Sequence, residues 1–167
     1  LESLMASWDA QSNMAEAASS QEPFAMAFLD YYKFFDSFQP EFFGQFLAKA
    51  GIHKDFVKLF VHLNANSRRY VKVADTFSEP ILPFNALGQG DPWVLIVAIL
   101  YVSTQFKMVQ HYAPLVKSKA VIDDRSLQGP PDQLHAALLL IFVFDALAGH
   151  ITHPEKITLS ACTLRDR

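Results

Sequence analysis

The hydrophobic pattern changes its period several times along the first third of the chain. Residues 24–30 (FAMAFLD) carry the aromatic and apolar residues of a strand that ends in a carboxylate. Residues 40–51 instead repeat apolar positions at helical spacing and stop at a glycine, and residues 53–67 continue with a second helical period. The apolar residues of this second helix share one face: Phe56, Leu59, Phe60 and Leu63. We expect a strand followed by two helices.

The middle of the chain holds a β-prone segment and a long apolar helix. Residues 69–74 (RYVKVA) favour a strand, and the loop NALGQGD follows. Asp91 stands at the N-cap position and Pro92 at the first helical position. The pattern therefore predicts a helix over 93–111.

The last third predicts a hairpin, a helix and a closing strand. Residues 117–122 form one arm, Asp123 and Asp124 occupy the turn, and residues 125–127 return. An apolar helix over 132–148, ended by a glycine, precedes a strand over 156–162. Strands from distant parts of the chain predict an α+β domain with a largely antiparallel sheet and helices packed on one face.

Composition supports one folded domain with a loose beginning. The 167 residues are 51% hydrophobic and 19% charged, which is enough apolar surface for a core. Residues 1–22 are rich in Ala, Ser and Gln, so we expect a loosely ordered lead-in there and a folded domain over 23–167.

The charge balance does not favour a nucleic-acid partner. The net charge is −3 and the isoelectric point is near 6.0, whereas nucleic-acid-binding domains usually present a basic face. The basic residues are nevertheless grouped: Arg68, Arg69 and Lys72, then Lys117, Lys119 and Arg125.

Other classes of site and location are disfavoured. A single cysteine, Cys162, excludes an internal disulfide and a cysteine zinc cluster, so we expect an intracellular, reducing compartment of unspecified identity. His150 and His153 lack a third ligand nearby and are interpreted as surface imidazoles. The longest apolar run, 93–102, is shorter than the ~20 residues of a membrane span, so no membrane segment is predicted.

Three carboxylates stand where strands end. Asp30 closes the first strand, and Asp123 and Asp124 occupy the hairpin tip. Phosphoryl transfer from a triphosphate needs Mg²⁺ held by a few carboxylates, because this ion prefers hard oxygen ligands. Each carboxylate alone is typical of a solvated turn, so only their combination indicates a site.

Four segments together resemble the palm motifs of reverse transcriptases, of the kind encoded by non-LTR retroelements. They occur in the order that the family has and cover roughly residues 24–163. The segments are LDYYKFFDSF (29–38), GQGDPW (88–93), VIDDRSL (121–127) and HITHPEKITL (150–159). The resemblance implies a polymerase palm-like fold and an RNA-directed DNA polymerase that transfers deoxynucleotides to a primer 3′ end.

The same resemblance implies a set of metal ligands and an acid. Asp30 and Asp123 match the residues that bind catalytic Mg²⁺ (or Mn²⁺), with Asp124 close by and the backbone carbonyl of Tyr31 as a further ligand. Lys156 matches the lysine that protonates the pyrophosphate leaving group. An exposed lysine before a strand is the alternative interpretation of Lys156.

Three more positions match nucleotide-binding residues. Phe35 matches the aromatic beneath the sugar that excludes a 2′-hydroxyl, although a core aromatic remains an alternative in a chain with 15 phenylalanines. Gln89 and Gly90 match the loop that touches the nucleotide and the template strand. A glycine turn before a capped helix would also explain Gly90.

The chain departs from the family at Val94, where a small serine is usual, and at Val121, where an aromatic is usual. Most of the fingers and the thumb are also missing, so residues 23–167 are interpreted as a palm fragment that is inactive alone.

The expected partners are an RNA or DNA template with primer, deoxynucleoside triphosphates, and the remaining fingers and thumb of the parent polypeptide. The alternative function is a degenerate, non-catalytic retroelement relic that at most associates with nucleic acid.

Overall fold

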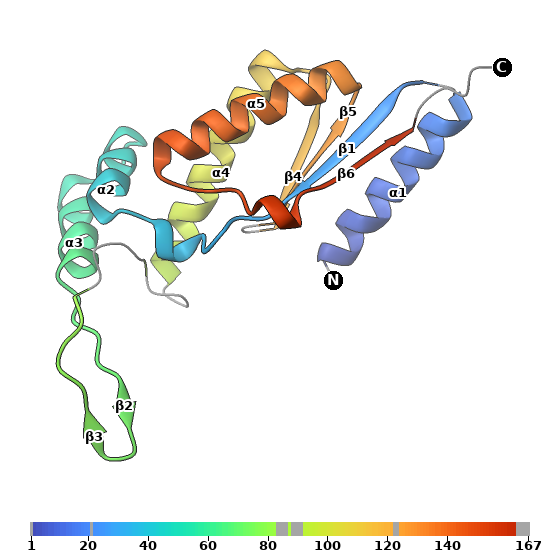
Figure 1. The fold of residues 1–167 in the computed structure, drawn as a ribbon. Helices are drawn as coiled ribbons and strands as arrows, with labels where there is room; N and C mark the ends of the chain where they lie inside the picture. The colour runs from blue at the N-terminus through green and yellow to red at the C-terminus, as the bar shows by residue number, and fades with distance from the viewer. Residues whose placement is uncertain (1, 21, 83–86, 88–91, 122–123, 163–167) are drawn as a thin grey trace. The chain divides into compact units, whose positions relative to one another are not determined.

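The computed structural model describes residues 2–20, 22–82, 87, 92–121 and 124–162 (Figure 1). The chain divides into two units, one of residues 1–32 with 98–167 and one of residues 33–97. The elements in chain order are α1 (Glu2–Ser20), β1 (Phe24–Leu29), the short helix η1 (Phe35–Ser37), α2 (Pro40–Lys49), α3 (Lys54–Ala65), β2 (Lys72–Val73), β3 (Thr76–Phe77), α4 (Pro92–Tyr112), β4 (Lys117–Val121), β5 (Asp124–Gly129), α5 (Pro131–Ala148), the short helix η2 (Pro154–Lys156) and β6 (Thr158–Cys162).

The first unit is built on a four-stranded antiparallel sheet with the order β4-β5-β1-β6. The central strand β1 pairs on both sides, so that Ala27 lies opposite Leu127 of β5 and Leu159 of β6. The predicted hairpin is confirmed, because β4 and β5 pair directly across the segment that links them. The α+β class with an antiparallel sheet is likewise confirmed.

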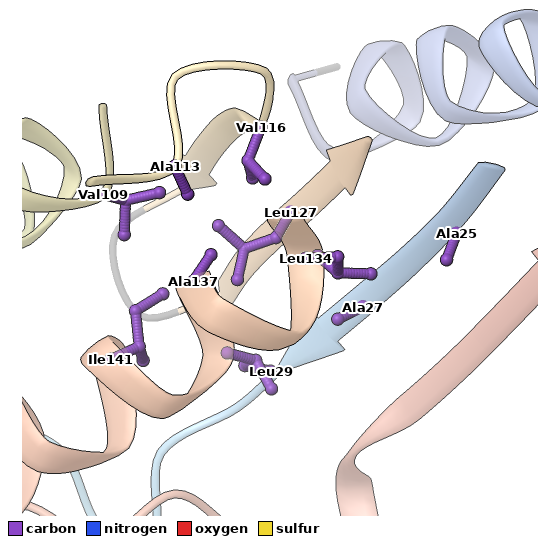
Figure 2. Close-up of a cluster of buried hydrophobic side chains, with 10 residues drawn as sticks. All are labelled: Ala25, Ala27, Leu29, Val109, Ala113, Val116, Leu127, Leu134, Ala137 and Ile141. Carbon is purple, nitrogen blue, oxygen red and sulfur yellow. The ribbon is translucent and has the colours of Figure 1, made fainter. Parts of the chain in front are cut away.

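Helices α4 and α5 cover one face of this sheet. Side chains of a strand alternate between its faces, and every second residue of β1 and β5 points toward these helices. Figure 2 shows the resulting core between α5, the end of α4 and the sheet. Its fully buried members are Ala27, Val109, Ala113, Leu127, Ala137 and Ile141. Burial of this face fixes the register, since a slip of one residue would turn the apolar side chains away from the helices.

Helix α1 packs on the sheet from the other side (Figure 1). The amide of Asn13 donates to Oε1 of Gln128 at 3.2 Å, and Gln128 alternates with Leu127, which belongs to the helix-covered core. Ala17 is buried in the same contact. The sequence analysis expected a loose lead-in over residues 1–22, whereas the structure places a helix at Glu2–Ser20. Its alanines and other strong helix formers explain the difference, because they favour a helix once one side can dock.

The second unit contains α2, α3 and a small hairpin of β2 and β3. Helix α2 ends at Lys49, and Gly51, just beyond the C-cap Ala50, has a φ of 87°, the left-handed conformation expected of a glycine that terminates a helix. The expected apolar face of α3 is only partly buried, since Phe60 is buried while Leu59 and Leu63 are exposed. The predicted strand over 69–74 is shorter than expected and forms the exposed hairpin arm at Lys72–Val73.

Two helices are long and apolar enough to cross a membrane by length and composition, Trp93–Tyr112 and Pro131–Ala148, whereas the sequence analysis predicted none. Both helices bury side chains against the sheet in the first unit, including Val109 and Ile141. They also carry the buried polar residues Gln105 and Asp145.

Candidate active site

The edge of the sheet where β1 ends and β5 begins holds two of the predicted carboxylates, Asp30 and Asp124. Leu29, the last residue of β1, lies opposite Arg125 of β5. Asp30 follows the last paired residue of β1, and Asp124 precedes Arg125 at the start of β5. Both residues line the same cavity. The fold therefore brings together two carboxylates from the first and third of the recognised motifs.

A cavity of about 350 Å³ lies at this edge. Five charged residues line it: Asp30, Asp124, Lys119, Lys156 and the largely buried Arg125. The other lining residues come from the ends of the same strands and include Phe28, Val121 and Ser126. The cavity is thus lined by both carboxylates and cationic groups.

Lys156 reaches Asp30 across the cavity. Its Nζ donates to Oδ2 of Asp30 at 2.5 Å, with 60% of the lysine side chain and 21% of the aspartate side chain exposed. The short helix η2 presents the lysine, and the backbone N–H of His153 donates to the carbonyl of Asp30 at 2.8 Å. The segment that precedes β6 is therefore bound directly to the residue that carries the first carboxylate.

Behind the two carboxylates lies a buried polar cluster around Asp145 of α5. The guanidinium Nη1 of Arg125 donates to Oδ2 of Asp145 at 2.9 Å, and both side chains are almost fully buried. Oδ1 of Asp145 accepts from Tyr31 at 3.0 Å, from Tyr101 at 2.8 Å and from the amide of Gln105 at 2.7 Å. A buried charge pair of this kind is tolerated because hydrogen bonds satisfy the remaining lone pairs.

Tyr31 turns its side chain into this cluster. The ring is 4% exposed, and Cζ of Arg125 lies 3.6 Å from its centre in a cation–π contact. Burial raises the pKa of Tyr31 well above its ordinary value, although the Arg125 charge opposes the rise. The hydroxyl therefore stays protonated and donates to Asp145. Only the backbone of Tyr31 is available for the ligand role that the resemblance implies.

His150 belongs to the same cluster, and its interpretation as a surface imidazole is wrong. It is 2% exposed and packs against the rings of Tyr31 and Tyr101, with centroid distances of 5.5 and 4.8 Å. Burial is the main cause that lowers the pKa of His150 to about 4, so the ring is neutral at neutral pH. The spacing of the two histidines carried no sign of this burial.

Phe35 lies in the second unit, within the short helix η1. It is half-buried and packs edge-on against Phe34 at 5.2 Å between centroids and stacks with Phe38 at 6.5 Å. Its carbonyl accepts from the backbone N–H of Leu87 at 3.0 Å. These contacts suit both a sugar-facing ring and a packing residue, so its role stays a prediction.

Several predicted positions lie outside the described residues: Asp123, Gln89, Gly90 and the N-cap Asp91. Among the residues that the structure describes, no group of three or more His, Cys, Asp or Glu side chains is placed to hold a metal ion.

The two residues that depart from the family motifs are apolar and lie in buried or half-buried positions. Val94 is 1% exposed on α4, and Val121 is half-buried at the end of β4.

The pair of Arg125 and Asp145 was missed by sequence reasoning. Arg125 had been grouped with Lys117 and Lys119 as a basic cluster, but its side chain is buried whereas both lysines are exposed. A signal was present in the helix, because Asp145 interrupts the apolar run of residues 136–148. A charged residue within such a run is almost never fully buried unless it is paired.

Comparison with known proteins supports the fold. No known family model and no curated protein sequence matches the chain. Among solved structures, it is similar to telomerase from Candida tropicalis in complex with a fragment of telomeric RNA. The TM-score is 0.68 at 11% identity, over 92% of this chain and 29% of that one. It is also similar to apo telomerase from Candida tropicalis truncated from its C-terminal domain, with a TM-score of 0.66 at 16% identity, over 84% of this chain and 31% of that one.

These neighbours establish the kind of fold. The chain has a polymerase-like α+β fold that is similar to part of the telomerase fold. It spans less than a third of either telomerase chain. The neighbours give no support to a non-LTR retroelement origin in particular.

Proposed function

We propose that this chain is the palm part of an RNA-directed DNA polymerase, which adds deoxynucleotides to a primer 3′ end. The observation that carries the proposal is the meeting of Asp30 and Asp124 at neighbouring strand ends, in one cavity with Lys156, on a reverse transcriptase-like fold. Motif order in the sequence supports the same conclusion independently of the coordinates.

The carboxylates provide the proposed metal ligands. Asp30 and Asp124, with Asp123 and the backbone carbonyl of Tyr31, would hold Mg²⁺ or Mn²⁺. The residues offer the hard carboxylate oxygens that such an ion prefers, and the Asp30 carboxylate is paired with a cation, the ammonium group of Lys156. When bound, the ions stabilise the attacking and leaving oxygens of phosphoryl transfer. The protein supplies fixed oxygen ligands, since positioning and electrostatics account for most of this catalysis.

Lys156 has two roles in the proposal. Its exposed side chain balances the charge of Asp30 before substrate binds, and its flexible stem lets the ammonium group swing toward a bound triphosphate. There it would donate a proton to the departing pyrophosphate oxygen.

The remaining contacts of the proposal belong to the nucleotide and the template. Phe35 would lie beneath the sugar, and Gln89 with Gly90 would touch the nucleotide and template strand. An RNA template is supported by the telomerase neighbour, whose structure contains a fragment of telomeric RNA. The remaining fingers and thumb of the parent polypeptide would clamp primer and triphosphate, so the 167-residue chain by itself should show little primer extension.

Metal binding by the purified chain gives the first test. Titration with Mn²⁺, followed by the EPR signal of the free ion, should reveal weak binding that Asp30→Asn and Asp124→Asn each abolish. Asp132→Asn is the matched control, because Asp132 is an exposed aspartate of the same unit that does not line the cavity. Binding that survives both cavity substitutions would contradict the proposal.

Primer extension by the parent polypeptide gives the second test. Deoxynucleotide incorporation on an RNA template should require Mg²⁺ and should disappear in Asp123→Asn. A second candidate function, nucleic-acid association without catalysis, is favoured by the exposed cations Arg68, Arg69 and Lys72 on the hairpin segment and Lys117 on β4. Salt-sensitive RNA binding without any Mg²⁺-dependent synthesis would establish that function instead.

A further inference from the structure

We infer that Tyr31, Arg125 and Asp145 act as a clasp on the back of the sheet that sets the separation of the two carboxylate-bearing strand ends. These three are positioning residues, since each acts through a neighbour rather than by touching substrate. The inference rests on the proposed function, because it assigns the clasp to the metal-binding edge.

The clasp follows from the alternation of strand side chains. Tyr31 comes directly after Asp30, and Arg125 comes directly after Asp124. Successive side chains of an extended segment point to opposite faces, so each carboxylate on the cavity side has the next residue behind the sheet. Both of those residues are buried, at 4% and 1% exposure, while Asp124 is exposed. The backbone that aims each carboxylate is therefore held by the residue that follows it.

The two residues that follow the carboxylates are bound to each other and to one acceptor. The guanidinium of Arg125 lies 3.6 Å from the centre of the Tyr31 ring. The Tyr31 hydroxyl donates to Oδ1 of Asp145 at 3.0 Å, and Arg125 Nη1 donates to Oδ2 at 2.9 Å. One carboxylate of α5 thus ties together the end of β1 and the start of β5.

The clasp suits the demands of a magnesium site. Mg²⁺ accepts ligands only near ~2.0–2.1 Å in octahedral geometry, so a small change in the spacing of two carboxylates weakens binding. A charge-assisted network inside the protein is stronger and less adaptable than one in water. Thr152 completes it by donating to Oδ2 of Asp145 at 3.2 Å, and its backbone pairs with Tyr31.

Tyr101 provides a matched comparison within the same cluster. Its hydroxyl also donates to Oδ1 of Asp145, at 2.8 Å, and its side chain is 1% exposed. It belongs to α4, which carries no candidate metal ligand. Deleting either hydroxyl removes one buried hydrogen bond to the same oxygen, but only the Tyr31 hydroxyl belongs to the residue that follows a candidate ligand.

The test compares Tyr31→Phe with Tyr101→Phe in the purified chain, using Mn²⁺ affinity measured by EPR and the melting temperature. Both substitutions should lower the melting temperature to a similar degree. Tyr31→Phe should weaken Mn²⁺ binding about tenfold, the lower end of what losing an outer hydrogen-bond partner costs a metal site. Tyr101→Phe should leave Mn²⁺ affinity unchanged.

The outcomes separate this inference from the proposed function. Equal Mn²⁺ affinity in the two variants, with Asp30→Asn still abolishing binding, would overturn the clasp and leave the proposed function standing. A wild-type chain that binds no Mn²⁺, or an Asp30→Asn chain that binds as wild type does, would refute the proposed function and the clasp with it.

Discussion

The ammonium nitrogen of Lys156 lies 2.5 Å from a carboxylate oxygen of Asp30, although 126 positions separate the two residues in the chain. The pair joins the last of the recognised motifs to the first, at the rim of the cavity. A cation therefore already stands beside the carboxylate that is proposed to bind another.

Replacing this lysine should strengthen metal binding and weaken catalysis. Lys156→Gln removes the competing cation, and Mn²⁺ affinity of the chain should rise by up to about fivefold, because an exposed ion pair contributes only about 0.2–1 kcal/mol. Primer extension by the parent polypeptide should fall, because the proton donor is lost. EPR titration and single-turnover kinetics measure the two effects. Lys117→Gln on β4 is the control and should leave Mn²⁺ affinity unchanged. A loss of Mn²⁺ affinity in Lys156→Gln would contradict the idea that the lysine and the metal ion compete for Asp30.

Phe35 is predicted to discriminate between sugars. In the parent polypeptide, Phe35→Ala should raise ribonucleotide incorporation relative to deoxynucleotide incorporation, since the smaller side chain leaves room for a 2′-hydroxyl. The ratio of kcat/KM for the two triphosphates measures this. Phe42→Ala, at another partly exposed phenylalanine of the same unit, should leave the ratio unchanged. An unchanged ratio in Phe35→Ala would assign Phe35 to packing with Phe34 and Phe38.

Breaking the buried ion pair should cost much more stability than removing it whole. Asp145→Leu leaves the Arg125 charge buried without its carboxylate and should lower the free energy of unfolding by about 3–5 kcal/mol. The double variant Arg125→Met with Asp145→Leu should recover much of that loss, because neither buried charge remains. Urea denaturation of the four chains in the cycle measures the coupling. Additive losses would show that the pair does not act as a unit.

The buried His150 should make stability depend on pH. Its folded pKa of about 4 lies below the ordinary 6.5, because burial disfavours the charged ring; nearby Asp145 opposes this shift, and Arg125 supports it. Between pH 6.5 and pH 4, His150 binds a proton more readily in the unfolded chain than in the folded one. The contribution of His150 to the free energy of unfolding is therefore fully present above pH 6.5 and is lost as the pH falls toward 4. The loss from this group should approach about 1.4 kcal/mol per pH unit.

Urea denaturation at pH 7.5 and pH 5 measures this dependence. His150→Phe, which keeps an aromatic ring between Tyr31 and Tyr101, should lose the His150 share of the acid destabilisation. An identical pH dependence of the free energy of unfolding in the variant and the wild type would show that the His150 imidazole has the same pKa in the folded and unfolded states.

Local sequence was sufficient for features that depend on neighbouring residues. Gly149 ends α5 with a φ of 79°, as a glycine after an apolar helix predicts. The pairing of β4 with β5 agrees with the predicted hairpin, although Asp124, which was predicted in the turn, is the first residue of β5. Motif order likewise predicted that Asp30 and the hairpin would meet, because each motif marks one strand end.

Only the tertiary structure decided which charges are buried and with what partners. Arg125 and Lys119 look alike in the sequence, yet the guanidinium is buried and the ammonium group is exposed, because Asp145 of α5 lies on one side of the sheet only. Likewise, the docking of α1 includes a hydrogen bond between Asn13 and Gln128, which are 115 positions apart. Periodicity reports which face of an element is apolar, but the residue that satisfies a buried charge comes from a distant element, and only the packed fold brings the two together.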